Sequence, residues 1–484
     1  MEGMRMAIPA NGMDKEKVLS ALKDFAGEDP DYKTMKMWSL VYYLGEEHAD
    51  FLTKAYGMFL SANGLNPLAF KSLKRIETQV VQMTASLLNG PPTTTGVMTS
   101  GGTESCLLAV KTYRDRGHAE KKIKKPEMIL PETAHVAWQK GAEYFGVRIR
   151  CASLSKNLGV DPGSVKKLIS RNTVMILGSA PEYPHGMIDP IEELGTVALK
   201  EDIPLHVDAC LGGFLLPFIE KLGYPLPLWD FRVPGVASIS ADVHKYGFSA
   251  KGSSVILYRD TELMKHQFFI SESWPGGAFA SPALLGTRPG GAYAAAWASL
   301  MALGEDGFKK NAADIMETVK KIRDGIRAIG ELEVIGEPPS AIFAYKSNSK
   351  EVNIYAVADQ MEKRGWHIDR LQKPEALHAM VTPRHLEITD SYLDDLRASV
   401  EFVKKRPELA LEGRAAMYGM IANIPLRNMV KKNILKMFCD LYGPEGKMID
   451  PADVKADEAG TEVKPDIATR AALLYLKIRQ KLTK

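Results

Sequence analysis

The stretch Ser240-Ala241-Asp242-Val243-His244-Lys245-Tyr246-Gly247 decides the fold, because it closes a short run of strand-forming residues and places a lysine directly after it. A lysine held in a crowded site can lose its proton and act as a nucleophile. Upstream, Asp208 ends a second apolar run in the same way. Chemically active side chains that follow neighbouring strands predict a ligand site where those strands end.

Short strand-like runs alternate with helical patterns through the middle of the chain. The runs lie at 96–99, 128–130, 147–152, 174–178, 205–208, 236–240 and 254–258. This alternation predicts an α/β fold with a mainly parallel sheet covered by helices on both faces. Ligands bind such sheets at the carboxyl ends of the strands.

The flanking regions follow other patterns. Apolar residues at helical spacing predict helices within 16–62 and from 73 to a stop at Asn89-Gly90-Pro91-Pro92. After 315, short strands mix with helices, and the last predicted helices lie at 429–442 and 469–482. We therefore expect an N-terminal helical segment (1–60), a large domain (61–315) and a smaller α+β C-terminal domain (316–484).

The composition bounds the possible partners and compartments. The 62 Lys and Arg residues nearly balance 59 Asp and Glu residues, and a net charge of +3 argues against nucleic acid as a partner. The four cysteines form no CxxC pair, which predicts no cysteine metal site and favours a reducing, cytoplasmic compartment. No apolar run approaches the ~20 residues that span a bilayer, so we expect no stable membrane insertion.

A glycine-rich segment, Thr99-Ser100-Gly101-Gly102-Thr103-Glu104-Ser105, follows a predicted strand and opens a helix. Free N–H groups at a helix start, together with the helix dipole, bind phosphate. Gly102 and Thr103 are therefore candidate phosphate ligands. The alternative is an ordinary strand-to-helix turn with a capping box from Ser100 or Thr103.

Three further side chains follow predicted strands. His135 begins a helix, where its imidazole can stack on a flat ring, and Tyr183 lies in a proline-rich loop with a group able to transfer protons. Asp208 ends an apolar strand, and a buried carboxylate needs a cationic or hydrogen-bonded partner. A protonated pyridine nitrogen would supply that partner.

Taken alone, a residue of any of these kinds more often has a structural role or lies exposed at the surface than takes part in a site. Their order along the chain is nevertheless a phosphate-binding turn, a stacking histidine, a strand-end aspartate and a strand-end lysine. Pyridoxal 5'-phosphate requires these parts, because it has a phosphate, a flat ring, a ring nitrogen and an aldehyde that bonds to lysine. The sequence therefore predicts this cofactor at Lys245.

From about 35 to about 445 the chain resembles a fold-type I pyridoxal-phosphate enzyme of the group II decarboxylase branch. Within that branch it is similar to the sphingosine-1-phosphate lyase family. The similarity rests on the segments 178–191, Asp242-Val243-His244-Lys245-Tyr246-Gly247 with Lys251-Gly252, 276–282 with 286–290, and Ala416-Met417-Tyr418-Gly419-Met420.

The resemblance implies roles for individual residues. Lys245 resembles the lysine that carries the cofactor as a Schiff base, Asp208 the partner of the pyridine nitrogen, and His135 the residue that stacks on the ring. The positions that hold the cofactor phosphate are matched by Gly102, Thr103 and His244. Tyr183 matches a tyrosine that moves protons near the substrate hydroxyl, and the substrate-phosphate pocket is matched by Tyr43, Lys251 and Thr287.

One departure from the family concerns the substrate. Where the family reads Asn-Pro-Leu-His-Pro, this chain has Asn63-Gly64-Leu65-Asn66-Pro67, so Asn66 replaces a histidine that contacts phosphate. Asparagine can donate a hydrogen bond but carries no charge, and charge-assisted bonds to phosphate are stronger. The substrate amine is therefore less well defined than the cofactor.

The resemblance implies a lyase that splits a phosphorylated long-chain amino alcohol, similar to sphingosine-1-phosphate, by retro-aldol chemistry. Its products would be an aldehyde and phosphoethanolamine. One alternative is an amino-acid decarboxylase (a carboxy-lyase), which binds the cofactor through the same residues. The other is a catalytically silent homologue. Family enzymes are homodimers with shared active sites, and the loop 286–290 is the expected contribution to the partner subunit.

Overall fold

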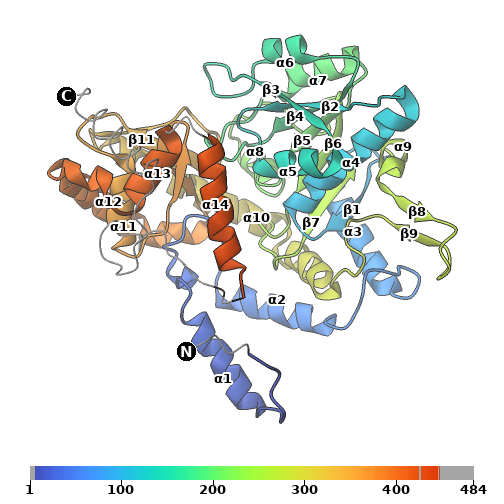
Figure 1. The fold of residues 1–484 in the computed structure, drawn as a ribbon, viewed down its shortest axis with the longest axis horizontal. Coiled ribbons are helices and arrows are strands. Elements are labelled where there is room, and N and C mark those ends of the chain that lie inside the picture. Colours follow the sequence, from blue (N-terminus) through green and yellow to red (C-terminus); the bar gives the residue numbers. More distant parts are fainter. Residues whose placement is uncertain (1–5, 424–426, 445, 447–484) are drawn as a thin grey trace.

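A seven-stranded sheet forms the centre of the larger part of the molecule in the computed structural model, which describes residues 6–423, 427–444 and 446 (Figure 1). Its strand order is β1-β7-β6-β5-β4-β2-β3. The strands are β1 (Thr95–Thr99), β2 (Glu127–Pro131), β3 (Arg148–Ala152), β4 (Thr173–Ser179), β5 (Leu205–Asp208), β6 (Val236–Ala241) and β7 (Ser254–Tyr258). Only β7 runs antiparallel to its neighbours, which confirms the predicted mainly parallel sheet.

Helices cover both faces of this sheet, so its strands are apolar on both sides. In β2, Met128 and Leu130 enter one core while Ile129 enters the other, as the alternation of side chains along a strand requires. The covering helices are α3 (Lys71–Leu87), α4 (Gly102–Lys121), α5 (Val136–Phe145), α6 (Pro162–Leu168), α7 (Ile191–Lys200), α8 (Leu216–Lys221) and α9 (Thr261–Met264).

A four-stranded antiparallel sheet forms the smaller part, in the order β10-β11-β13-β12. The strands are β10 (Leu332–Val334), β11 (Ile342–Ser347), β12 (Asp369–Gln372) and β13 (Glu375–Met380). Its helices are α11 (Ile354–Glu362), α12 (Thr389–Lys404) and α13 (Gly413–Asn423), and α14 (Arg427–Leu441) follows. The predicted helix at 469–482 lies outside the described residues.

The long helix α10 (Gly290–Arg327) connects the two sheets. It contains a break at Gly304, whose φ of 57° and ψ of −177° lie outside the helical region. A positive φ of this kind favours glycine. The predicted domain boundary at 315 falls inside α10, and the three-part division stays a prediction. Residues 292–303, a stretch rich in apolar residues, form the mostly buried first part of this helix.

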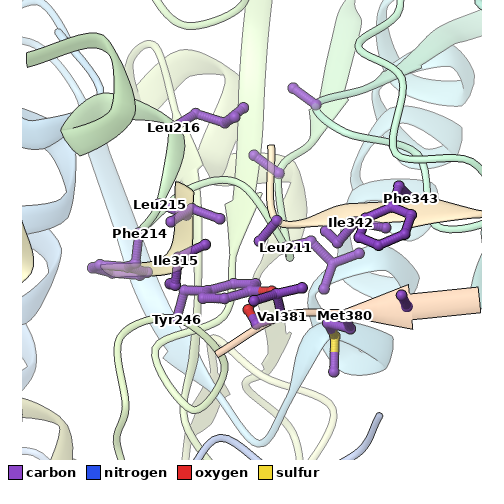
Figure 2. Packing of buried hydrophobic residues seen from close by; sticks show 14 of the residues in the cluster. Leu211, Phe214, Leu215, Leu216, Tyr246, Ile315, Ile342, Phe343, Met380 and Val381 are labelled. Carbon is purple, nitrogen blue, oxygen red and sulfur yellow. The ribbon is translucent and has the colours of Figure 1, made fainter. Parts of the chain in front are cut away.

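A shared apolar core joins the two parts beside the lysine turn. Figure 2 shows that Tyr246, directly after Lys245, packs among side chains from both parts, including Leu211, Ile342 and Val381. The Tyr246 hydroxyl also donates a hydrogen bond of 2.9 Å to the carbonyl of Val381. The smaller sheet is therefore fixed next to Lys245 by packing and by this bond.

Two peripheral elements expose apolar side chains. The helix α1 (Lys15–Ala26) has no buried residue and projects away from the body of the molecule, with Leu19, Leu22 and Phe25 exposed (Figure 1). The hairpin of β8 (Phe269–Ser271) and β9 (Phe279–Ser281) also projects. The chain further contains α2 (Glu46–Met58) and 3-10 turns at Tyr32–Thr34, Lys265–Gln267, Pro383–Ile388 and Pro407–Leu411. In the described ranges, no helix combines the length and apolarity needed to cross a bilayer.

Candidate active site

A cavity of about 390 Å³ opens at the carboxyl ends of β4, β5 and β6. This is the edge at which the alternating pattern predicted a ligand site. Most of the predicted site residues line the cavity, namely Gly102, Thr103, His135, Tyr183, Asp208, His244, Lys245 and Lys251. The fold therefore brings together residues that are far apart in the sequence.

Lys245 forms an ion pair at the base of this cavity. Its Nζ lies 3.0 Å from a carboxylate oxygen of Asp242, which is buried one turn earlier in the chain. Burial alone would lower the pKa of Lys245, but the negative charge of Asp242 outweighs it and the net shift is upward. Without a cofactor, Lys245 is therefore a charged ammonium group.

Asp208 is held in its ionised form at the end of β5. Its Oδ2 accepts a hydrogen bond of 2.9 Å from Nε1 of Trp138, and its Oδ1 accepts one of 3.1 Å from the backbone N–H of Cys210. Burial alone would raise the pKa of Asp208, yet hydrogen bonds from the side chains of Trp138 and Cys210, with the nearby His135 and Lys245, bring it below its ordinary value. A carboxylate with a lowered pKa in this cavity suits a protonated ring nitrogen.

The start of α4 has free N–H groups at the cavity. Gly101 precedes the helix with a φ of 156°, and no side chain caps its first turn. The alternative capping box from Ser100 or Thr103 is therefore absent at this helix; instead, the Ser100 N–H donates to Glu104 at 2.7 Å. Gly102 and Thr103 line the cavity, so their N–H groups suit an anion such as phosphate.

The side chain of His244 lies next to Gly101. Its Nδ1 is 2.7 Å from the carbonyl of Ser253, so Nδ1 carries a proton and donates it. Burial lowers the pKa of His244, which favours the neutral ring. The ring is thus fixed in orientation at the phosphate-binding end of the cavity.

His135 and Tyr183 also line the cavity. The Nδ1 of His135 accepts a hydrogen bond of 3.2 Å from the N–H of Ala137, and burial lowers the His135 pKa. A neutral imidazole is suited to stacking on an aromatic ring. Tyr183 lies with its ring centroid 6.4 Å from that of His135, and its hydroxyl donates to Asp369 at 2.7 Å.

Lys251 is a second cation in the same cavity. Its Nζ donates a hydrogen bond of 2.8 Å to the carbonyl of Leu40 and lies 5.0 Å from the ring centroid of Tyr42. Burial and the nearby charge of Lys245 lower the pKa of Lys251 to about 8. Among the described residues, no carboxylate forms an ion pair with it.

Three predicted substrate residues lie outside this cavity. Tyr43 packs edge-on against Tyr32, whereas its neighbour Tyr42 lines the cavity. Asn66 is exposed and caps its own turn, since its Oδ1 accepts from the N–H groups of two following residues. Thr287 is also exposed, and its hydroxyl accepts a hydrogen bond from Asn63. These three residues are not among those that line the cavity.

Two buried cysteines lie next to Asp208. The thiols of Cys106 and Cys210 and the Asp208 carboxylate have ligand atoms within 4.8 Å of one another. Burial raises the pKa of Cys106 to about 11, and the pKa of Cys210 is also well above its ordinary value because of its contact with Cys106 and its burial. Raised pKa values favour the protonated thiols, which pack as small apolar groups.

Sequence reasoning missed the residues that support the reactive groups. Trp138 lies three residues after His135, which caps the start of α5, so both lie in or next to the first turn of this helix. Asp242 lies three residues before Lys245 in the turn that follows β6, and its place in the same turn could have indicated its role. Asp369 had no such signal, because it comes from β12 in the other sheet.

These residues fit pyridoxal phosphate. The uncapped start of α4 suits its phosphate, Asp208 its ring nitrogen, His135 its ring face and Lys245 its aldehyde. The fold and the cavity thus define a pyridoxal-phosphate-dependent enzyme of fold type I.

Comparisons with known proteins identify the family within this class of enzymes. Residues 48–347 match the pyridoxal-dependent decarboxylase conserved domain. The sphingosine-1-phosphate lyase of Oryza sativa subsp. japonica is 45% identical over 441 residues, which cover 90% of this chain and 81% of that protein. The solved sphingosine-1-phosphate lyase of Burkholderia pseudomallei K96243 has a TM-score of 0.83 and 37% identity, covering 91% of this chain and 98% of that one.

The chain belongs to the sphingosine-1-phosphate lyase branch of the pyridoxal-dependent decarboxylase family. A glutamate decarboxylase of Lactobacillus brevis CGMCC 1306 has a TM-score of 0.73 at 19% identity, covering 84% of this chain and 96% of that one. At that identity the likeness shows the common fold alone.

Proposed function

We propose that this enzyme cleaves the C–C bond of a phosphorylated long-chain amino alcohol by retro-aldol chemistry, releasing a long-chain aldehyde and phosphoethanolamine. The two sphingosine-1-phosphate lyases named above carry this substrate in their names, and the cavity has the chemistry to accept it. The observation that carries the proposal is the second cation, Lys251, beside the lysine that binds the cofactor.

Binding of the cofactor does not by itself require the positive charge of Lys251. The first lysine of the cavity is neutralised by Asp242, whereas Lys251 contacts only a carbonyl and an aromatic face in the described part of the chain. Its pKa is lowered by burial and by the charge of Lys245, and Asp242 offsets this only in part. A substrate phosphate would compensate this charge, which an ordinary α-amino acid would not do in the same way.

Bound pyridoxal phosphate accepts the electron pair that remains when a bond to the amine-bearing carbon breaks. Asp208, kept ionised by Trp138, would hold the ring nitrogen protonated. Lys245 would be the attachment point of the aldehyde, and Asp242 would receive its ammonium group when the substrate amine replaces it. His135 would fix the plane of the ring, and Lys251 would orient the substrate by its phosphate.

Two product assays test the proposal. Purified holoenzyme is given phosphorylated sphingoid bases and, separately, a panel of amino acids, while aldehyde and CO2 are followed. We expect aldehyde from the phosphorylated amines, and loss of both turnover and the visible absorbance of the bound cofactor in Lys245→Ala. Release of CO2 without aldehyde would instead establish the decarboxylase alternative.

We also propose a homodimer whose subunits complete each other's sites. Asn66 and Thr287 lie outside the cavity of their own subunit, and Asn63 ties their two loops together through bonds to Thr287 and to Arg288. The exposed apolar side chains of α1 and of the β8–β9 hairpin suit a subunit interface.

A mixing experiment tests the shared site. Lys245→Ala subunits are combined with subunits that carry both Asn66→Ala and Thr287→Ala. A mixed dimer then contains one intact lysine facing one intact loop, so activity rises above the sum of the two parent proteins. Unchanged activity after verified subunit exchange would show that each site uses one chain only. The cytoplasmic location stays a prediction.

A further inference from the structure

The hydroxyl of Tyr183 donates a hydrogen bond of 2.7 Å to Oδ2 of Asp369. Tyr183 comes from the loop after β4 in the large sheet and lines the cavity with Lys245. Asp369 is the first residue of β12 in the small sheet. The bond therefore connects the cavity to a carboxylate on the other part of the molecule.

The ring of Tyr183 is fixed by its neighbours. It stacks on His378 with centroids 4.2 Å apart and an interplanar angle of 29°. His378 is the cross-strand partner of Asp369 in the β12–β13 pair, so the stacking residue and the hydrogen-bond acceptor are positioned by the same two strands. Only small movements are then needed for proton transfer between Tyr183 and Asp369.

The carboxylate of Asp369 has the Tyr183 hydroxyl as a hydrogen-bond partner. In the described part of the chain, it forms no ion pair with a lysine or arginine. The adjacent Arg370 points elsewhere, because its guanidinium pairs with Asp359 at 2.6 Å and with Glu362 at 2.7 Å. Asp369 is also only partly buried, so its carboxylate is accessible to solvent.

The proposed reaction needs a group that removes the proton of the substrate hydroxyl. Free Lys245 is an ammonium group, and the Nδ1 lone pair of His135 is already used by the N–H of Ala137. Tyr183 faces the cavity, but burial and Asp369 raise its pKa far above the ordinary range. The phenol can therefore accept a proton only if it gives up its own proton at the same time.

We propose that Tyr183 and Asp369 form a proton relay for C–C cleavage, with Asp369 as the final proton acceptor. This inference rests on the proposed lyase function. The substrate O–H bond breaks as a new O–H bond forms at Tyr183 Oη, and the original Tyr183 proton moves to Asp369 Oδ2. The substrate oxygen then forms the aldehyde carbonyl, and the electron pair of the broken C–C bond stays with the amine-bearing fragment.

Holoenzyme variants test the relay. Asp369→Asn keeps the side chain size and an oxygen that can accept the tyrosine hydrogen bond, but removes the proton acceptor. We expect kcat for aldehyde release to fall about 100-fold, within the range for general base catalysis, while KM and the cofactor absorbance change less than twofold. Asp369→Glu should recover part of the loss, because it restores a carboxylate.

The double variant decides whether the two residues act together. If Asp369 acts through Tyr183, then Tyr183→Phe combined with Asp369→Asn is no slower than Tyr183→Phe alone, within about twofold. Multiplied losses in the double variant would overturn the relay, as would an unchanged kcat in Asp369→Asn. A loss of kcat accompanied by altered KM, altered cofactor absorbance or a lower apoenzyme Tm would also overturn it, because Asp369 would then be structural.

Tyr355→Phe is the matched control. It removes a tyrosine hydrogen bond of 2.5 Å to the carbonyl of Leu371 on the same strand, β12, outside the cavity. We expect its kcat to remain near that of the wild type. A 100-fold loss of kcat in this control would mean that a displaced β12 strand, and not the lost proton acceptor, explains the Asp369→Asn result, and it would overturn the relay. If wild-type enzyme releases no aldehyde, the proposed function itself fails, and that result is distinguishable from failure of the relay.

Discussion

The carboxylate of Asp242 lies 3.0 Å from Nζ of Lys245, and its side chain is only 1% exposed. The pair determines when the lysine can react, because an ammonium group cannot attack an aldehyde. Gly102 is required for the close approach of α4, since a Cβ there would lie 2.5 Å from an oxygen of Asp242. The lysine, its counter-ion and the phosphate-binding turn are therefore packed as one unit.

Asp242→Asn tests this control of Lys245. Removing the negative charge lowers the pKa of Lys245, since burial then dominates. The apoenzyme variant should bond to pyridoxal phosphate faster near pH 8, by about tenfold for each unit by which the lysine pKa falls. Visible absorbance after rapid mixing measures this rate. Asp230→Asn is the control, because Asp230 is equally buried but pairs with Arg232 away from the cavity; an equal effect there would refute the interpretation.

Trp138→Phe tests the support of Asp208. The substitution removes the 2.9 Å hydrogen bond to Oδ2, so the Asp208 pKa should rise and the carboxylate should hold a protonated ring nitrogen less well. A hydrogen bond to a charged group contributes about 1.5–3 kcal/mol, so kcat should fall at least tenfold. Trp297→Phe loses a similar indole bond, to Gln79 at 2.7 Å, and should keep its kcat.

Lys251 predicts a pH dependence of substrate binding. With a pKa of about 8, it is charged below that pH and becomes neutral as the pH rises through it. The value of kcat/KM for a phosphorylated amine should therefore fall above pH 8, by up to tenfold per pH unit. Lys251→Arg should keep its activity to higher pH, since arginine stays charged, and Lys251→Met should be weak at every pH. An identical alkaline fall in all three proteins would exclude Lys251 as its cause.

The cofactor-binding part of the site could be predicted because its residues each follow a strand. Asp208 and Lys245 end or follow β5 and β6, and parallel strands bring their carboxyl ends to one edge whatever the intervening helices. The same rule located Gly102 and His135. These placements depend only on strand order within one sheet, which the alternating pattern indicates.

The substrate side could not be predicted in the same way. The segment with Tyr42 and Tyr43 has no regular secondary structure, so no periodicity says which ring enters the cavity. The strand with Asp369 was not predicted, because Asp369 and Arg370 are charged and such residues are uncommon in strands. Its meeting with Tyr183 depends on how the two sheets dock, and local sequence does not encode that docking.

Gly304→Ala tests the break in α10. The φ of 57° is unfavourable for a residue with a Cβ, although no atom lies within 4 Å of the position that a Cβ would take. The cost should therefore come from the backbone alone, about 1–2 kcal/mol, and should appear as a lower Tm. Gly57→Ala, in α2, is the control, because it also meets no atom and has no positive φ, and it should raise Tm slightly.

Asn66→His tests whether the departure from the family alters phosphate binding. A histidine is charged below about pH 6.5, so KM for a phosphorylated amine should fall about tenfold at pH 6 and little at pH 8. The turn loses its cap, because Oδ1 of Asn66 accepts from Leu68 at 3.0 Å and from Ala69 at 3.2 Å, and this should cost about 1 kcal/mol of stability.

Asn66→Asp separates these two effects. Aspartate caps the turn as well as asparagine does, so stability should be kept, while its negative charge should raise KM. If neither substitution changes KM in the assembled enzyme, Asn66 does not contact the substrate phosphate. Lys251 would then be the principal charge that selects a phosphorylated substrate, and the loss of the family histidine would have no effect on specificity.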